Sequence, residues 1–307
     1  MANTIQATGL RYFVEVATTG SVSAASAELH VAVSAVSRQI SILESEVGAP
    51  LFERYARGMQ LTAAGEMLLA YARRMFADGD AVLSAISEHG GSGGRTVRIA
   101  CSEGFAHEFV PAVVADFKLE HPHAKFSLHV DGPDEVTERV KRGEADFGLI
   151  FTMLASPDVD TLSTTLAPIC AVIPSGHQLH SRDSVTIEDL LDFPLVLPAK
   201  GASLRQIFDA CCAPIGRSAI TFLEGNNSSA MLGVAARCNA ICLTSHVAVP
   251  TQSSSNQFKV IPIDHEQMRA RVIQLQYMKG RTLDSNLKHL AQLLAERLDK
   301  AQKGLMC

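Results

Sequence analysis

Side chains that can hydrogen-bond to another molecule gather on one face of the stretch 32–47. Ser34, Ser37 and Arg38 share that face, whereas Val36 begins an apolar stripe that recurs at helical spacing on the opposite face. This spacing predicts a helix with one buried and one exposed side. Hydroxyls and a guanidinium on an exposed helix can contact base edges and phosphates in the major groove of DNA. We interpret the face as a candidate DNA-contact surface; an ordinary solvated helix face is the alternative.

A second set of candidate residues follows apolar runs with the character of strands in the rest of the chain. In open α/β sheets, ligands bind beyond the carboxyl ends of strands, where helix N-termini offer free N–H groups. Such N-termini favour anions, whereas carboxylates such as Glu103 and Asp131 would tolerate an amine or another polar group. For each polar residue, a capping or turn role is the alternative. The candidate small-molecule contacts are Ser102, Glu103, Phe105, Asp131, Thr152, Ser203, Asn226 and Thr244.

Catalytic and metal-binding patterns are weak or absent. The sequence has no Walker loop, no HExxH and no GxGxxG after a strand, so we expect no enzymatic activity. His121, His123 and His129 lack a carboxylate or cysteine at matching spacing, and we expect no metal and no cofactor other than a small-molecule effector. Cys211 and Cys212 are adjacent in a predicted helix, where packed thiols and a redox pair are the alternatives.

Short helices near the N-terminus must position the DNA-contact face. The apolar spacing predicts a first helix over about 6–18. Ser21 and Ser23 are N-cap candidates for a short second helix that ends near Leu29. A turn at His30 then leads into the helix that carries the candidate contacts. We expect the short second helix to lie close across the contact helix, so that the contact helix can project into a groove.

The segment that follows predicts a hairpin and a long helix. Residues 48–50 stop the contact helix, and "LFER" with "YARGMQL" predicts a two-stranded wing with its tip at Arg57 and Gly58. Thr62 then caps a helix that runs to about Glu88. Its apolar and small residues recur at alternating steps of three and four, a coiled-coil seam too narrow for burial within one chain, which predicts dimerisation. The seam comprises Leu69, Ala72, Phe76, Gly79, Leu83 and Ile86.

A glycine-rich segment, 89–94, predicts a linker and a domain boundary. After it, apolar strands alternate with helical patterns as far as a last helix near 283–301. Alternation of this kind predicts parallel sheets covered by helices, and its length is enough for two α/β lobes.

Three stretches within 20–65 give a resemblance to a known family. The patterns "GSVSAAS..L", "AVSRQI..LE..VG..LFER" and "LTAAG" resemble the winged helix-turn-helix of the LysR-type transcriptional regulators. Weaker matches such as "RVKRGEADFGLIF" extend the resemblance over the whole chain. The resemblance implies a multidomain fold of α+β and α/β class: an N-terminal winged helix-turn-helix, a long linker helix, and a two-lobed α/β effector domain like a periplasmic binding protein.

The resemblance also implies a mode of action. Such regulators bind promoter or operator double-stranded DNA as a dimer of dimers, and a small-molecule inducer between two subdomains resets how the tetramer bends DNA. In them the chain enters the second lobe near the position of Pro168 and returns near that of His265. We therefore expect a DNA-binding domain over 1–62, a linker (dimerisation) helix and Gly-rich hinge over 63–94, and an effector domain over 95–307, with lobe I at about 95–167 and 265–307 and lobe II at about 168–264.

Candidate DNA contacts follow from the helix-turn-helix match. Arg38 is the first choice for a base or phosphate contact, and the wing arginines suit phosphates and the minor groove. Val33 stands where the family often has a hydrogen-bonding residue, so we expect an apolar contact there, for example with a thymine methyl. The expected DNA-binding residues are Ser23, Val33, Ser34, Ala35, Ser37, Arg38, Arg54 and Arg57.

Charge and hydropathy limit the possible partners and compartment. The formal net charge is -5, and residues 1–75 carry equal numbers of arginines and glutamates, so DNA contact must come from local placement of cations. No apolar run is long enough for a bilayer and no signal peptide is apparent, so we expect a cytoplasmic protein with no membrane partner. The leading hypothesis is a ligand-responsive transcriptional regulator of nearby genes. The alternatives are a small-molecule binding protein or a cysteine redox sensor whose helical head serves only for oligomerisation.

Overall fold

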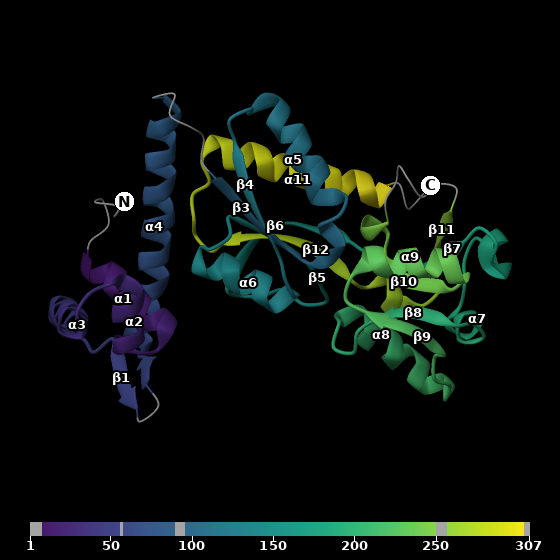
Figure 1. The fold of residues 1–307 in the computed structure, drawn as a ribbon, viewed down its shortest axis with the longest axis horizontal. Helices are drawn as coiled ribbons and strands as arrows, with labels where there is room; N and C mark the ends of the chain where they lie inside the picture. Colours follow the sequence, from purple (N-terminus) through teal and green to yellow (C-terminus); the bar gives the residue numbers. More distant parts are fainter. Residues whose placement is uncertain (1–7, 56–57, 90–95, 250–256, 304–307) are drawn as a thin grey trace. The chain divides into compact units, whose positions relative to one another are not determined.

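The computed structural model describes residues 8–55, 58–89, 96–249 and 257–303. The chain divides into two compact units, and each is described by itself below. The first unit is a helical head with a long helix, and the second is an α/β unit with two sheets (Figure 1). Among the described helices, none combines the length and the apolar character needed to cross a membrane.

Three short helices form the core of the head. Ser21 caps the second of them, because its side chain accepts a hydrogen bond from the N–H of Ala24 at 3.4 Å. His30 ends that helix in the left-handed conformation, with φ 55°, and this places the predicted turn where the third helix begins. Phe13 and Val36 are fully buried between the helices. The helices are α1 (Thr8–Thr19), α2 (Val22–Leu29) and α3 (Val33–Val47).

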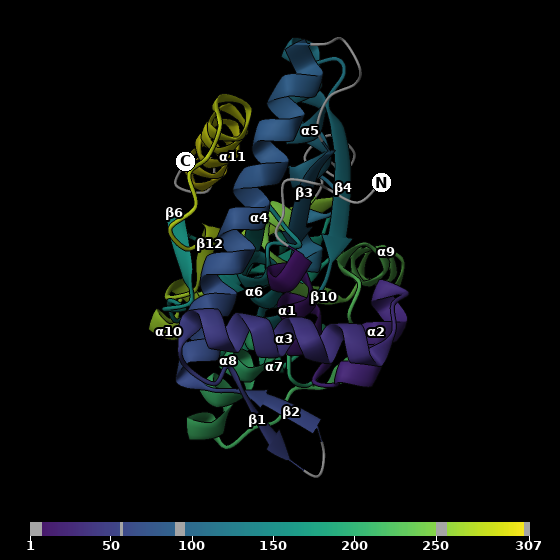
Figure 2. The ribbon, with the colours of Figure 1, turned by 90° about the vertical axis from the view of Figure 1, so that its left-hand side faces the viewer.

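The predicted wing is an antiparallel hairpin of β1 (Phe52–Tyr55) and β2 (Gly58–Leu61), which projects beyond α3 (Figure 2). The carboxylate of Glu44, on α3, accepts a hydrogen bond from the N–H of Leu51 at 2.8 Å. On the other strand, the N–H of Met59 donates to the carbonyl of Gly20 at 2.8 Å. The wing is therefore fixed both to the contact helix and to the turn between α1 and α2.

The long helix, α4 (Ala63–His89), begins directly after the wing. The predicted cap is confirmed, since the Thr62 hydroxyl accepts a hydrogen bond from the N–H of Gly65 at 3.0 Å. Gly65 has no room for a side chain: a Cβ there would lie 2.2 Å from the carbonyl oxygen of Leu51. A glycine in this first turn lets the helix approach the wing closely.

The exposed apolar face of α4 differs from the seam that the sequence predicts. Leu69 was expected to face a partner chain, but it is buried in the core of the head because α1 packs on the start of α4. Ile86 is 62% exposed, as a seam residue would be in a single chain. The large apolar side chains exposed on α4 are Met67, Tyr71, Val82 and Ile86.

The α/β unit contains two five-stranded sheets, which we call lobe I and lobe II. Both are mixed and not parallel as expected: β12 runs antiparallel to β5 and β6, and β7 runs antiparallel to β10 and β11. The lobe I order is β4-β3-β5-β12-β6 and the lobe II order is β11-β7-β10-β8-β9. The strands are β3 (Thr96–Cys101), β4 (Lys125–Val130), β5 (Phe147–Thr152), β6 (Val159–Leu166), β7 (Ile169–Pro174), β8 (Leu195–Pro198), β9 (Thr221–Gly225), β10 (Ile241–Ser245), β11 (Phe258–Pro262) and β12 (Val272–Met278).

Helices cover both faces of each sheet. In lobe I, α5 and α11 pack on one face and α6 on the other. In lobe II, α7, α8 and α10 share one face and α9 covers the other. The bounds are α5 (Phe109–Glu120), α6 (Pro133–Arg142), α7 (Ile187–Leu191), α8 (Ser203–Cys212), α9 (Ser228–Cys238), α10 (Glu266–Arg269) and α11 (Ser285–Lys303).

Two crossings of the chain join the lobes. The chain passes to lobe II between β6 and β7 and returns between β11 and β12. The two crossings are hydrogen-bonded to each other: the N–H of Ala167 donates to the carbonyl of Arg271 at 2.9 Å, and Nε of Arg271 donates to the carbonyl of Ala167 at 3.3 Å. Arg271 therefore lies where the lobes are joined.

Candidate functional site

The first candidate site is the exposed side of α3. Val33 is 47% exposed, Ser34 and Arg38 are also exposed, and Ser37 and Ala35 are half-buried. Ser34 and Arg38 lie opposite the buried residues of the same helix, as the spacing predicts. Val33 lies on the same side as the buried Val36 and Ile40 but is exposed in the first turn. Of the other candidates, Ser23 is exposed on α2, Arg54 is exposed on β1, and Arg57 lies outside the described residues.

Electrostatics leave this face open to an anionic partner. Within the described part of the chain, neither Arg38 nor Arg54 forms an ion pair with a carboxylate, so both guanidinium groups can bind phosphates. The residue before α3, Ala32, provides no side-chain cap. The first N–H groups of the helix are therefore also available to an acceptor from outside the protein.

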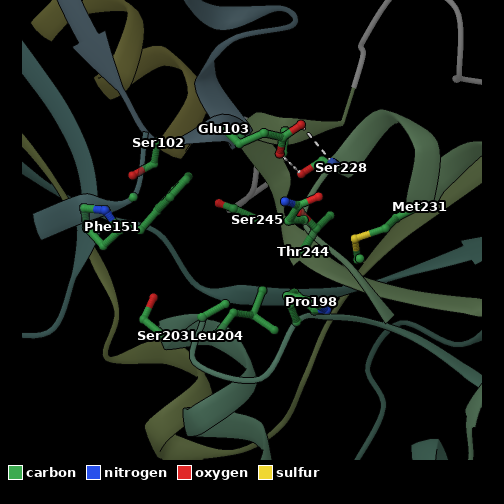
Figure 3. A pocket seen from close by; sticks show the side chains of 18 of the residues that line it. Ser102, Glu103, Phe151, Pro198, Ser203, Leu204, Ser228, Met231, Thr244 and Ser245 are labelled. Atoms are coloured by element: carbon green, nitrogen blue, oxygen red, sulfur yellow. Dashed lines mark hydrogen bonds between the residues drawn. The ribbon is translucent and has the colours of Figure 1, made fainter. Parts of the chain in front are cut away.

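The second candidate site is a cavity of about 390 Å³ between lobe I and lobe II (Figure 3). Its walls come from the carboxyl ends of β3, β4 and β5 in lobe I and of β8, β9 and β10 in lobe II. The N-termini of α6, α8 and α9 also reach it. A volume of this size suits a small organic molecule.

Most of the predicted small-molecule contacts line this cavity. They are Ser102, Glu103, Asp131, Ser203, Asn226 and Thr244. Phe105 does not line it, because its fully buried ring stacks on Phe151 within lobe I, with ring centroids 4.4 Å apart. Thr152 does not line it either: its hydroxyl donates to the carbonyl of Leu154 at 2.8 Å and accepts from the N–H of the same residue.

Both carboxylates of the cavity are engaged by the protein itself. Glu103 of lobe I reaches the first residue of α9 in lobe II, where Oε1 accepts from the N–H of Ser228 at 2.8 Å and Oε2 accepts from its hydroxyl (Figure 3). Asp131 accepts from Nε of Arg139 at 2.8 Å. From the sequence we expect carboxylates here to tolerate an amine or another polar group, but an amine ligand would have to compete with these partners.

Four more lining residues differ in how far the sequence indicates them. Phe151, Ser228 and Ser245 line the cavity, and each stands in a stretch that follows an apolar run, namely "FTM", "GNNS" and Thr244 with Ser245. Arg271 also lines the cavity, but it lies outside all of these stretches. For Arg271, a basic residue directly before the apolar run "VIQLQYM" is the only signal that the sequence offers.

The adjacent cysteines do not have the environment of a reactive thiol pair. Burial raises the pKa of the Cys211 thiol, and burial followed by Asp209 raises that of Cys212 to about 11. Sγ of Cys211 donates to Oε1 of Gln267 at 3.3 Å. Since the thiolate is the reactive form, these shifts oppose the redox-sensor alternative.

The histidines of "HPHAKFSLH" do not converge on a common point. His121 instead contacts His289, with Nε2 and Nδ1 3.1 Å apart, and Glu120 lies beside them. Among the described residues these three are the group close enough to share an ion. The two imidazoles are hydrogen-bonded to each other and Glu120 is exposed. We therefore interpret these three residues as a surface contact between the end of α5 and α11.

Family models match both units of the chain. The model for the bacterial regulatory helix-turn-helix protein, lysR family, matches residues 8–66, and the model for the LysR substrate binding domain matches residues 90–299. The chain belongs to the LysR family. It is a LysR-type transcriptional regulator with an N-terminal DNA-binding helix-turn-helix and a C-terminal effector-binding domain, and the predicted fold class is confirmed.

Individual proteins resemble this LysR-family chain over much of its length. The transcriptional dual regulator GltC of Bacillus subtilis is 28% identical over 264 residues, 86% of this chain and 88% of that protein. The HTH-type transcriptional regulator AlsR of the same organism is 31% identical over 210 residues, 67% and 69% of the two chains. The structure of a full-length OxyR variant from Pseudomonas aeruginosa shares the fold at 18% identity, with a TM-score of 0.64 over 96% of this chain and 95% of that one.

Proposed function

We propose that this regulator binds operator DNA through α3 and the wing, and that a small molecule in the cavity between the lobes controls that binding. The observation that supports the DNA-binding half best is the exposed first half of α3, with Arg38 free of any described ion pair and Glu44 fixing the helix to the wing. The proposed DNA contacts remain Ser23, Val33, Ser34, Ala35, Ser37, Arg38, Arg54 and Arg57.

Control by a ligand follows from the way the lobes are connected. Two hydrogen-bonded crossings at Ala167 and Arg271 allow the lobes to change their angle while remaining joined. A molecule that binds more tightly to one lobe angle shifts the population toward it. The shift alters the geometry of the assembly and hence its contact with DNA.

Several copies of the chain act together in the proposed regulator. We propose a cytoplasmic dimer of dimers that acts by binding and not by catalysis, and assign the dimer contact to the exposed apolar face of α4. Linking several DNA-binding heads raises affinity for an operator with matching half-sites. The proposed domains are 1–62 for DNA binding, 63–94 for the linker helix and hinge, and 95–307 for effector binding.

Substitutions on α3 test the DNA-binding half. Arg38→Ala should weaken binding to the DNA upstream of the gene by about tenfold or more, because a good contact of this kind contributes about 1 to 3 kcal/mol. Ser37→Ala should weaken it less, as a neutral hydrogen bond contributes about 1 kcal/mol. Binding is measured by fluorescence anisotropy at fixed salt concentration, with the exposed, ion-paired Arg297 of α11, changed to Ala, as the control.

Unchanged sequence-specific affinity in both α3 variants would remove this face from the DNA site. A wild-type chain that shows no sequence preference in a gel shift with its upstream DNA would favour the alternative in which the head serves only for oligomerisation.

A further inference from the structure

Arg271 is a buried cation with an unsatisfied donor. It is 3% exposed, and its Nη2 is buried without a hydrogen-bond partner. Its Nε donates to the carbonyl of Ala167. Within the described residues, no carboxylate forms an ion pair with it. A guanidinium that is buried without a counter-charge is costly, which indicates that its partner comes from outside the chain.

Other unsatisfied groups lie on the walls of the same cavity. The hydroxyls of Ser102 and Ser245 are buried without partners, and both residues line the cavity together with Arg271. The guanidinium lies over the ring of Phe151, 4.5 Å from its centroid, so one of its faces is covered and its edge remains for hydrogen bonds. The two serines come from opposite lobes, at the ends of β3 and β10. Unused donors from both lobes therefore line a single cavity.

The protein's own carboxylates cannot supply the missing charge as they stand. Glu103 is held by Ser228, and Asp131 is held by Arg139. At the N-terminus of α8, Ala202 provides no side-chain cap, so the first-turn N–H groups beside the cavity favour an anion as well.

We propose that the effector is a small monocarboxylate whose carboxylate binds Arg271, Ser102 and Ser245 and whose apolar body fills the rest of the cavity. This inference depends on the proposed function, in that it names the chemical class of the molecule that binds between the lobes. The planar fork of a guanidinium binds a carboxylate or a phosphate through two parallel hydrogen bonds. The apolar side chains of the lining favour an organic carboxylate over an inorganic anion. A ligand with a single negative charge is enough to balance the cavity, because Arg271 is the one basic residue among the described residues that line it. Apolar contacts come from Phe151, Pro198, Leu204 and Met231.

Because of the position of Arg271, a ligand bound to it would directly affect the angle between the lobes. Arg271 belongs to the return crossing and is hydrogen-bonded to Ala167 of the first crossing. Ser102 belongs to lobe I and Ser245 to lobe II. A carboxylate bound by all three would contact both lobes and the point where they join.

Matched pairs of probes test the charge requirement. The full chain is titrated with acetate, butyrate, hexanoate, benzoate and phenylacetate, with the carboxamide of each acid, and with inorganic phosphate. Thermal shift identifies binding and calorimetry gives Kd. At least one carboxylate should bind at least about tenfold more tightly than its amide, because the amide leaves the guanidinium unpaired. Binding of phosphate alone would identify the site as one for inorganic anions and overturn the carboxylate assignment.

Variants locate the binding to these side chains. Arg271→Met should weaken carboxylate binding by about tenfold or more, Arg271→Lys should restore part of it, and Ser245→Ala and Ser102→Ala should each weaken it severalfold. Ser163→Ala is the matched control: the Ser163 hydroxyl is also buried without a partner, but the residue is on β6 and does not line the cavity. If Arg271→Met does not fold, the affinities of Ser102→Ala and Ser245→Ala still show whether the carboxylate binds at this site.

The outcomes separate this inference from the proposed function. If no carboxylate binds, if amides or amines bind as well, or if the serine and Arg271 variants keep full affinity, the inference is wrong. A neutral molecule that binds the cavity and changes operator affinity would then leave the proposed function intact. A carboxylate that binds through Arg271 without changing operator affinity would support the inference and contradict the proposed control of DNA binding.

Discussion

Two buried bases, His246 and Arg271, differ in charge although burial lowers the pKa of both. Burial, with a smaller effect of Arg271, lowers the pKa of His246 to about 4, so this imidazole is neutral at physiological pH. Burial also lowers the pKa of Arg271, to about 10, which leaves it cationic. Neither ring nitrogen of His246 has a hydrogen-bond partner. The positive charge beside the cavity is therefore that of the guanidinium and not of the imidazole.

The lowered pKa of His246 predicts a loss of stability in acid. Between its ordinary pKa of 6.5 and about 4, the unfolded chain binds a proton that the folded chain does not. The stability that His246 contributes is thus complete above pH 6.5 and falls as the pH approaches 4. From neutral pH to about pH 5, the wild type should lose about 2 kcal/mol more than His246→Gln.

Urea denaturation at the two pH values measures this difference, with the exposed His107, changed to Gln, as the control. An equal loss in the wild type and in His246→Gln would show that the imidazole is not kept neutral by the fold.

The sequence predicts single residues well where the signal is local. The exposed and buried sides of α3 follow from spacing within one helix, and Ser102 and Asn226 follow from their places after strands. Arg271 could not be found in this way, and for Ser228, in the stretch "GNNS" after a strand, the contact with Glu103 could not be foreseen. Arg271 is hydrogen-bonded to Ala167, and Ser228 to Glu103. These partners are distant in the sequence, so local spacing carries no information about them.

At the scale of elements, one glycine decides how the long helix meets the wing. In the first turn of α4, Gly65 packs against the backbone of Leu51, directly before β1. Any larger residue must displace backbone and not a flexible side chain. The glycine of "LTAAG" is thus required by close packing.

Gly65→Ala should lower the free energy of unfolding by about 3 kcal/mol or more, because the added Cβ overlaps a backbone carbonyl. Gly79→Ala on the same helix is the control: a Cβ there meets nothing within 4 Å, and alanine has the higher helix propensity, so a gain of up to about 1 kcal/mol is expected. Chemical denaturation of both variants measures the difference. Similar stabilities would show that α4 can move away from the wing at little cost.

The elements themselves were largely predictable, but the direction of the strands was not. The order and approximate positions of the head helices, the wing and α4 follow from apolar spacing and caps. Alternating strands and helices predicted parallel sheets, and β7 and β12 contradict this because each follows a crossing between lobes without a covering helix of the usual length. Hydrophobic spacing is the same for either direction of a strand.

At the scale of the whole molecule, α4 carries an apolar face that the single chain does not cover. Met67, Tyr71, Val82 and Ile86 are separated by steps of four and eleven residues, which place them on one side of a helix. Exposed apolar residues in such a row are typical of an interface between copies of a chain.

Val82→Glu and Ile86→Glu together should shift the chain from the dimer of dimers toward smaller assemblies. They should also weaken operator binding by at least about tenfold, since linked heads bind more tightly than separate ones. Ala70→Glu, at an exposed position on a different side of α4, is the control. Sedimentation velocity measures the association state. If the double variant keeps the association state of the wild type, α4 does not form the contact.

The contact of Glu103 with Ser228 has a kinetic consequence. Because this carboxylate bridges the lobes beside the cavity, a ligand that needs the cavity open must wait for the bridge to break. Observed association rates would then level off at high ligand concentration, at the rate of opening, and would not rise in proportion to concentration. Glu103→Ala would remove that plateau, so the response time of the regulator would be set by one hydrogen-bonded side chain.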